Sequence, residues 1–202
     1  MHKTFFSTMT VFLFVLIGCG SVSTTDTSRI DDPKPYPAPK IADTDKQAYL
    51  DAINNARGNA QHCGSKGDFK ATSRLNWNDA LYRAAYEHDQ DMIKSGIINK
   101  DHTGSNTASD YTSTVHNLDH GSTVKERITN NGYPVAVGAE NLTAGTATDT
   151  PEKAVQEWLN SESHCAHLMD PNYKEVGMAH IQKSGTKYIH YWTQDFGTPK
   201  NQ

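Results

Sequence analysis

The order of the predicted secondary structure constrains this fold most, because helical patterns come first and strand patterns come last. Strand patterns cover 140–144, 176–182 and 188–196. Ser184-Gly185, between the last two, is a typical hairpin turn. Helices and strands do not alternate regularly, as they would around a parallel sheet. We therefore expect an α+β domain with an antiparallel sheet.

Four helices are predicted from apolar residues at helical spacing and from residues that start or stop helices. Small residues on the apolar face of the second helix, Ala84 and Ala85, should let it approach a sheet closely. The predicted starts and stops are a Thr44/Gln47 capping box and Gly58, then Asn78 and Gly96, then Ser122 or Thr123 and Asn131-Gly132, and finally Thr150-Pro151 for the fourth helix.

The N-terminus has the features of a lipoprotein signal peptide over residues 1–18. A short basic region is followed by an apolar run, 11–17, that is too short for the roughly 20 residues of a spanning helix. Leu-Ile-Gly-Cys at its end resembles a lipobox, with Cys19 as the lipidated first residue of the mature protein. The alternative is an ordinary secretory cleavage with an incidental cysteine. Gly20 and Ser21 favour the outer membrane over the inner one.

Residues 19–42 are predicted to be a tether. They are rich in Ser, Thr and Asp and then carry alternating prolines, so we expect an extended, semi-rigid stalk without a core of its own. The folded domain is then expected to cover 43–202.

Charge and cysteine content limit the possible environment and partners. The net charge is −4, with 19 basic residues and no cluster of them, which argues against a nucleic-acid partner. With Cys19 assigned to lipidation, Cys63 and Cys165 remain in a compartment that permits disulfides. We expect a bridge, although two separate thiols are the alternative.

A long ordered set of motifs resembles the bacterial branch of the CAP superfamily, which comprises cysteine-rich secretory, antigen 5 and pathogenesis-related proteins. The resemblance runs from about residue 45 to 197. The matching motifs are Leu75-Asn76-Trp77-Asn78, His88, His102, Arg127, Ala139-Glu140-Asn141, Trp158-Leu159-Asn160-Ser161, His164, Glu175-Val176-Gly177 and Tyr191-Trp192-Thr193-Gln194-Asp195-Phe196-Gly197.

This resemblance implies a three-layer α-β-α sandwich with a central antiparallel sheet and a shallow cleft. Family clefts carry two His and two acidic residues, and the matching positions are His102, His164 and Glu140. Eukaryotic members have a Glu where this chain has Ser161, and the acids nearest to that position are Glu162 next to it and Glu157 just before the Trp. The cysteine pair also matches one found in envelope members, which favours the Cys63–Cys165 bridge.

Two functions are compatible with this cleft. The first is a binding module of the cell envelope, holding zinc or another divalent metal on His102 and His164 and taking a small apolar or peptidic ligand or an envelope component. The second is a zinc-assisted hydrolase, a peptidase or esterase, with Glu140 as general base. We favour the first, because two histidines without a third protein ligand fall short of the usual catalytic zinc set. The same residues could instead form only a buried polar network.

The segment 103–121 is predicted to be a long loop that lies over the cleft, since it is rich in Thr, Ser and Asn. His116 and His120 within it are further, weaker candidates for metal ligands.

Overall fold

The computed structural model describes residues 30–200, and its centre is a four-stranded sheet. Lipidation of Cys19 and the signal peptide fall outside the described residues. The strand order is β3 (Asn76–Trp77), β5 (Glu175–Gln182), β6 (His190–Pro199) and β4 (Val135–Gly145). The three long strands are antiparallel, and the short β3 pairs with β5 in parallel.

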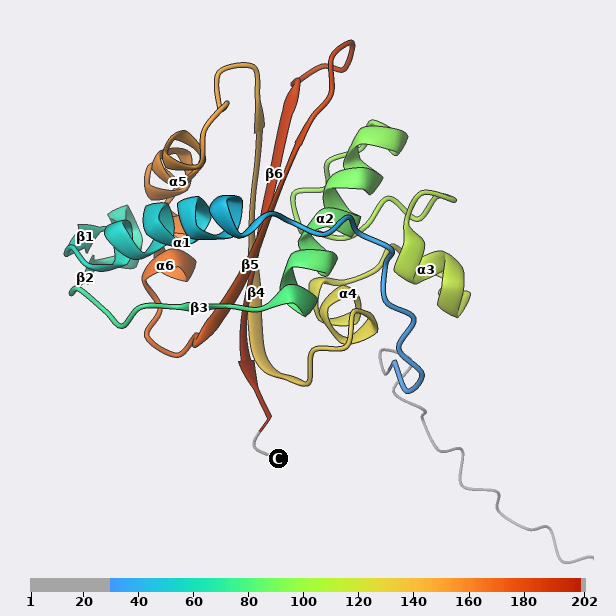
Figure 1. The fold of residues 1–202 in the computed structure, drawn as a ribbon, viewed down its shortest axis with the longest axis horizontal. Helices are drawn as coiled ribbons and strands as arrows, with labels where there is room; N and C mark the ends of the chain where they lie inside the picture. Colours follow the sequence, from blue (N-terminus) through green and yellow to red (C-terminus); the bar gives the residue numbers. More distant parts are fainter. Residues whose placement is uncertain (1–29, 201–202) are drawn as a thin grey trace, which may run out of the picture.

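Helices cover both faces of this sheet, so the predicted three-layer α-β-α sandwich is confirmed (Figure 1). One layer contains α1 (Asp43–Arg57), α5 (Pro151–Leu159) and α6 (Glu162–Met169). The other contains α2 (Asp79–Ser95), α3 (Tyr111–His116) and α4 (Val124–Asn130). A small hairpin of β1 (Gln61–His62) and β2 (Asp68–Phe69) encloses a 3-10 turn, η1 (Gly64–Lys66). No helix within 30–200 has the length and apolar character needed to cross a membrane.

Local sequence signals set most helix ends. The Asn78 side chain accepts the N–H of Ala80, and Gly96 ends α2 in the left-handed conformation. Thr123 caps α4 in a capping box with Glu126. The capping box predicted for α1 is wrong: its N-cap is Ala42, which has no side-chain cap, and Gln47 donates to Asp51 instead.

The core lies on both sides of the sheet, and α2 packs unusually close to it. Trp158, Trp192 and Phe196 are fully buried between the sheet and the layer of α1 and α5. On the opposite face, a Cβ added to Gly177 of β5 would collide with the backbone of α2 at Tyr82. The predicted close approach is therefore confirmed, and Gly177 makes it possible together with the small residues of the helix.

The start of the folded unit differs from the prediction, because residues 30–42 lie against the domain. Ile30 is buried, and the backbone N–H groups of Lys34 and Tyr36 donate to Asn130 and Asn131 at the end of α4. The segment is extended, as its prolines require. It is not a free stalk, however, and the packed unit includes residues 30–42.

The predicted Cys63–Cys165 disulfide is confirmed and links sequence positions 102 residues apart. It joins the residue before η1 to the middle of α6, and both cysteines are buried beside Met169. The bridge thereby fixes α6, which carries His164.

Removing the bridge should destabilise the domain. We expect Cys63→Ala/Cys165→Ala to lower the free energy of unfolding by about 4 kcal/mol, because a loop this long loses much of its freedom in the unfolded state when it is closed. Urea unfolding at constant pH measures the loss. The wild type unfolded under reducing conditions serves as the control and should lose a similar amount, whereas no effect of reductant would contradict a stabilising bridge.

Candidate functional site

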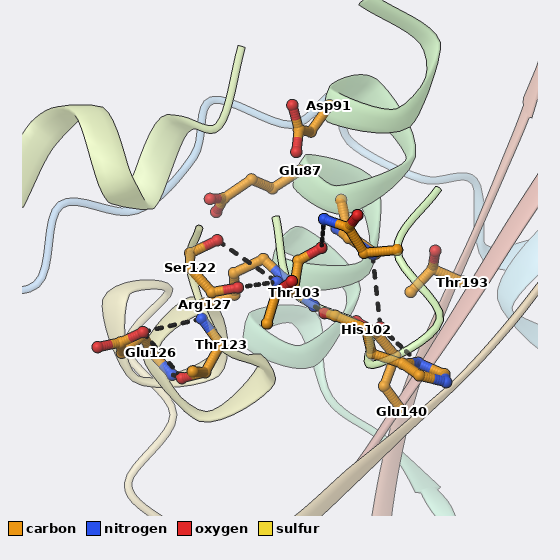
Figure 2. Close-up of polar contacts among 12 residues, drawn as sticks. Glu87, Asp91, His102, Thr103, Ser122, Thr123, Glu126, Arg127, Glu140 and Thr193 are labelled. Carbon is orange, nitrogen blue, oxygen red and sulfur yellow. Dashed lines mark hydrogen bonds and ion pairs between the residues drawn. The ribbon is translucent and has the colours of Figure 1, made fainter. Parts of the chain in front are cut away.

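The candidate site is built around Glu140, whose side chain is fully buried on β4. Its Oε2 accepts a hydrogen bond from Arg127 Nη2 at 2.8 Å, and its Oε1 lies 3.0 Å from His102 Nδ1 (Figure 2). Burial by itself raises the pKa of Glu140. The charge of Arg127, helped by His88 and His102, outweighs burial and holds this pKa well below its usual range.

Arg127 holds both the carboxylate and the backbone of the neighbouring histidine. This residue of α4 is buried, and its Nη2 also donates to the carbonyl oxygen of His102 at 2.9 Å. Its Nη1 donates to the carbonyl oxygen of Ser122. His102 has a φ of 63°, a left-handed conformation that is uncommon for a side-chain-bearing residue. The guanidinium therefore helps to hold His102 in a backbone shape that its own preferences oppose.

The long loop after His102 is tied to the helical layer by carboxylates. Asp91 of α2 accepts hydrogen bonds from the N–H and hydroxyl of Ser105, and Asp110 accepts the N–H of Ser122. The loop also contains α3, so the prediction of a stretch without secondary structure is wrong. These hydrogen bonds join residues 12 to 14 positions apart, so the periodicity of the sequence could not reveal that the loop is ordered.

The two loop histidines contact other partners. His116 Nε2 lies 2.8 Å from Asn130 Oδ1, and His120 Nε2 lies 3.2 Å from Glu126 Oε1. These contacts occupy a ring nitrogen of each, and they give no support to either residue as a metal ligand.

His164 on α6 meets His102 from the opposite helical layer. The two ring centroids are 5.7 Å apart and the rings are nearly perpendicular. Burial, with the nearby His102 and His167, lowers the pKa of His164 to about 4. Asn141 of β4 donates to the carbonyl oxygen of His164 and so ties α6 to the sheet. His164 is therefore a neutral imidazole at neutral pH, the form that binds metals.

The predicted substitutes for the missing acid do not complete the cluster. Ser161 is the N-cap residue of α6, and its side chain makes no capping bond. The Glu162 carboxylate accepts a hydrogen bond from Ser65 of η1. This contact places Glu162 at the disulfide-linked turn rather than beside Glu140, and the expectation that it belongs to the cleft is not supported by its position.

A second buried acid, Asp195, was not singled out as a site residue. Asp195 is the register partner of Glu140 across β4 and β6, and no N–H or hydroxyl group among residues 30–200 donates to its carboxyl oxygens. Burial and the adjacent Glu140 raise its pKa well above the usual range. The strand pairing that brings these two acids together is long-range, so no local pattern could have revealed it. A proton on Asp195 removes the repulsion between the pair.

His88 of α2 completes the surroundings of Glu140. Its Nε2 lies 3.6 Å from Glu140 Oε1, and burial followed by the charge of Arg127 lowers its pKa to about 4. His88 is only 2% exposed, and neither of its ring nitrogens has a hydrogen-bond partner among the described residues. It is therefore a neutral part of the core beneath the site.

The side chains around His102 and His164 provide only part of a metal-binding site. Between residues 30 and 200, no group of three or more His, Cys, Asp or Glu residues is arranged to hold a metal ion. His102 and His164 offer two imidazole nitrogens, while both oxygens of Glu140 are already occupied. A metal bound here would have two protein ligands and would need water or an incoming ligand for its other positions.

Replacing Arg127 alone should lower the free energy of unfolding more than replacing Arg127 and Glu140 together. We expect Arg127→Met to lower the free energy of unfolding by about 3–5 kcal/mol, because it leaves Glu140 buried without its cationic partner, whether the carboxyl keeps its charge or takes up a proton. Arg127→Met/Glu140→Gln should recover part of this loss. Chemical denaturation of the single and double variants measures the coupling, with the exposed Arg74→Met as the matched control. Strictly additive losses would contradict the pairing.

Asp195 should make stability depend on pH. Because the folded state keeps the Asp195 proton to a higher pH than the unfolded chain does, this residue's contribution to stability declines as pH rises above about 4. Asp195→Asn cannot ionise. Its free energy of unfolding relative to wild type should therefore increase between pH 4 and 8, by at most about 1.4 kcal/mol per pH unit.

The control for this pH series is Glu157→Gln, which removes an exposed carboxylate of α5. Parallel pH profiles for wild type and Asp195→Asn would show that Asp195 is ionised in the folded protein and would overturn the assignment.

Comparison with known proteins agrees with this architecture. Residues 50–196 match the model of the cysteine-rich secretory protein family, CAP. The uncharacterized protein YkwD of Bacillus subtilis is 31% identical over 65 residues, which span 32% of this chain and only 23% of that protein.

Solved structures with low sequence identity share the fold. An outer surface protein of Borrelia burgdorferi superposes with a TM-score of 0.56 at 20% identity, over 80% of this chain and 97% of that one. An extracellular SCP-domain protein of Bacillus anthracis gives 0.52 at 20% identity, over 81% of this chain and 45% of that one. On the family match and this shared fold, the chain belongs to the cysteine-rich secretory protein (CAP) family.

Proposed function

We propose that this protein is a binding module of the cell envelope whose cleft holds a divalent metal, zinc in the first instance, between His102 and His164. The carrying observation is the 3.0 Å contact between His102 Nδ1 and the ionised Glu140. A carboxylate acceptor at Nδ1 places the ring hydrogen there and leaves Nε2 with a free lone pair. Carboxylates commonly orient metal-binding histidines in this way.

The geometry favours binding over hydrolysis. A general base must take a proton from bound water, but Glu140 is fully buried, has both oxygens engaged and has a strongly lowered pKa. These properties make it a poor proton acceptor and a good orienting group. We therefore place the zinc-assisted peptidase or esterase second and assign Glu140 the role of positioning His102.

The remaining coordination positions suggest the kind of ligand. With two imidazoles from the protein, a bound metal would keep sites for water or for a carboxylate from a small peptidic molecule. A pocket of about 500 Å³ lies along β4 and α4; Asp101 and Thr103, the sequence neighbours of His102, line it, whereas His102 and His164 do not. Ile128, Val135 and Val137 make part of that lining apolar. A small ligand with an apolar portion, or an envelope component, fits these surroundings.

The location that we propose is the outer membrane, with the chain exported and anchored through lipidated Cys19. The sequence around Cys19 supports this, as does the disulfide, which belongs to oxidising compartments. More than one acyl chain is needed for durable anchoring. The structural relatives described as an outer surface protein and an extracellular protein are compatible with such a location.

Zinc calorimetry on purified protein tests the metal site. We expect His102→Ala and His164→Ala each to abolish measurable zinc binding, because each removes one of the two proposed protein ligands. Glu140→Gln should weaken binding by about 10–100-fold through loss of orientation. His62→Ala removes an exposed histidine of β1 and should leave the affinity unchanged. Unaltered zinc affinity in both ligand variants would rule the site out.

A further inference from the structure

Residues 30–41, which we call the strap, are docked on the domain by a pattern that their prolines create. Pro33, Pro35, Pro37 and Pro39 alternate with other residues, and proline has no N–H to donate. Within 33–39, the only backbone donors are therefore Lys34, Tyr36 and Ala38. All three are satisfied: Lys34 and Tyr36 donate to side chains of α4 and its cap, and Ala38 donates to the Tyr36 carbonyl.

Two buried asparagines bind the strap backbone. Asn130 accepts the N–H of Lys34 and returns a hydrogen bond from its Nδ2 to the Lys34 carbonyl, both at 2.9 Å. Asn131 accepts the N–H of Tyr36, also at 2.9 Å. Neither asparagine has exposed surface. Donors two residues apart along an extended chain are bound here much as an edge strand binds an added peptide.

Side chains fix the position of the strap further. The Tyr36 ring packs against Tyr111 of α3 at 5.0 Å and against Tyr86 of α2 at 6.2 Å between centroids. Lys34 Nζ donates to the carbonyl oxygen of Val115, and the Tyr82 hydroxyl donates to that of Pro39. In Figure 1, the blue strap leaves α1, crosses α2 and descends past α3. These contacts run along the α2, α3 and α4 layer.

We infer that the strap determines which face of the domain meets the membrane, namely the face of α3 and α4. This inference rests on the proposed anchoring at Cys19. Ile30, the first described residue of the strap, is the eleventh residue after Cys19, whereas Asp43 is the twenty-fourth. At about 3.5 Å per residue, the anchor is thus at most about 40 Å from the strap, against about 85 Å for a tether that stayed free up to α1.

Docking therefore halves the maximum distance between Cys19 and the first residue that is held on the domain. The partner of this face is the phospholipid bilayer that holds the anchor. His102 belongs to the same layer, since Arg127 of α4 holds its backbone. In this orientation, the helical layer that holds His102 is on the membrane-facing side of the domain.

Energy transfer from the protein to the membrane tests this orientation on the full mature lipoprotein in phospholipid vesicles. A donor dye is attached at Thr114→Cys on α3 or at Glu152→Cys on α5, both exposed positions, and the acceptor dye is carried by lipid headgroups. We expect transfer from Thr114→Cys to be several-fold stronger than from Glu152→Cys. Equal transfer from the two sites in vesicle-bound protein would overturn the inference.

A variant of the strap separates docking from folding. Lys34→Pro/Tyr36→Pro removes the two N–H donors that the asparagines bind and changes no residue of the helices or sheet. In this double variant, energy transfer from the two dye positions should become nearly equal, and zinc binding should be unchanged. The matched control is Lys40→Pro, whose N–H has no hydrogen-bond partner among the described residues, and it should keep the wild-type difference. An unchanged difference in the double variant would show that the strap does not orient the domain.

Flotation of the vesicles tests anchoring at Cys19 separately from the orientation of the domain. Wild-type protein should float and Cys19→Ala should not. If wild type fails to float, anchoring at Cys19 is wrong and the orientation is wrong with it, while zinc calorimetry still decides the metal site. If it floats but both dye positions transfer equally, only the orientation is wrong.

Discussion

The buried ion pair of Arg127 and Glu140 is the interaction on which the rest of the site depends. A carboxylate without a partner in this position would be neutralised, because burying an isolated charge is very costly. With Arg127 at 2.8 Å, Glu140 stays ionised and fixes the ring of His102. The same guanidinium holds the His102 backbone, so one cation sets both the position and the hydrogen-bonding state of that histidine.

The groups around this pair are arranged so that it remains the main charge pair beside His102. Burial raises the pKa of Asp195 and of Asp89, and it lowers that of His88, so each of these side chains favours its neutral form. The hydroxyl of Thr193 donates a hydrogen bond to one of the two buried carboxyl oxygens of Asp89. The pairing of β4 with β6 sets Asp195 directly across from Glu140. The sheet and α2 thereby surround Glu140 with mostly neutral polar groups, and its charge is available for orienting His102.

Local signals were sufficient for much of the fold, and long-range contacts explain most of what they missed. Asn78, Gly96 and Thr123 act on residues within four positions of themselves, so the ends of α2 and α4 could be predicted. The strap could not, because its partners Asn130 and Asn131 lie 95 to 96 residues away and its composition alone indicates a free stalk. In the site, family motifs located His102, Glu140 and His164. The roles of Arg127 and Asp195 depend on strand register and side-chain direction, which no sequence period encodes.

The central claim is that ionised Glu140 holds the Nδ1 hydrogen of His102 and leaves Nε2 free. Nitrogen-15 NMR of the histidine rings in metal-free protein above pH 7 tests it most directly, since it distinguishes a protonated ring nitrogen from an unprotonated one. We expect a protonated Nδ1 and an unprotonated Nε2 for His102 in wild type, with this preference weakened in Glu140→Gln. A His102 ring protonated at Nε2 instead would contradict it.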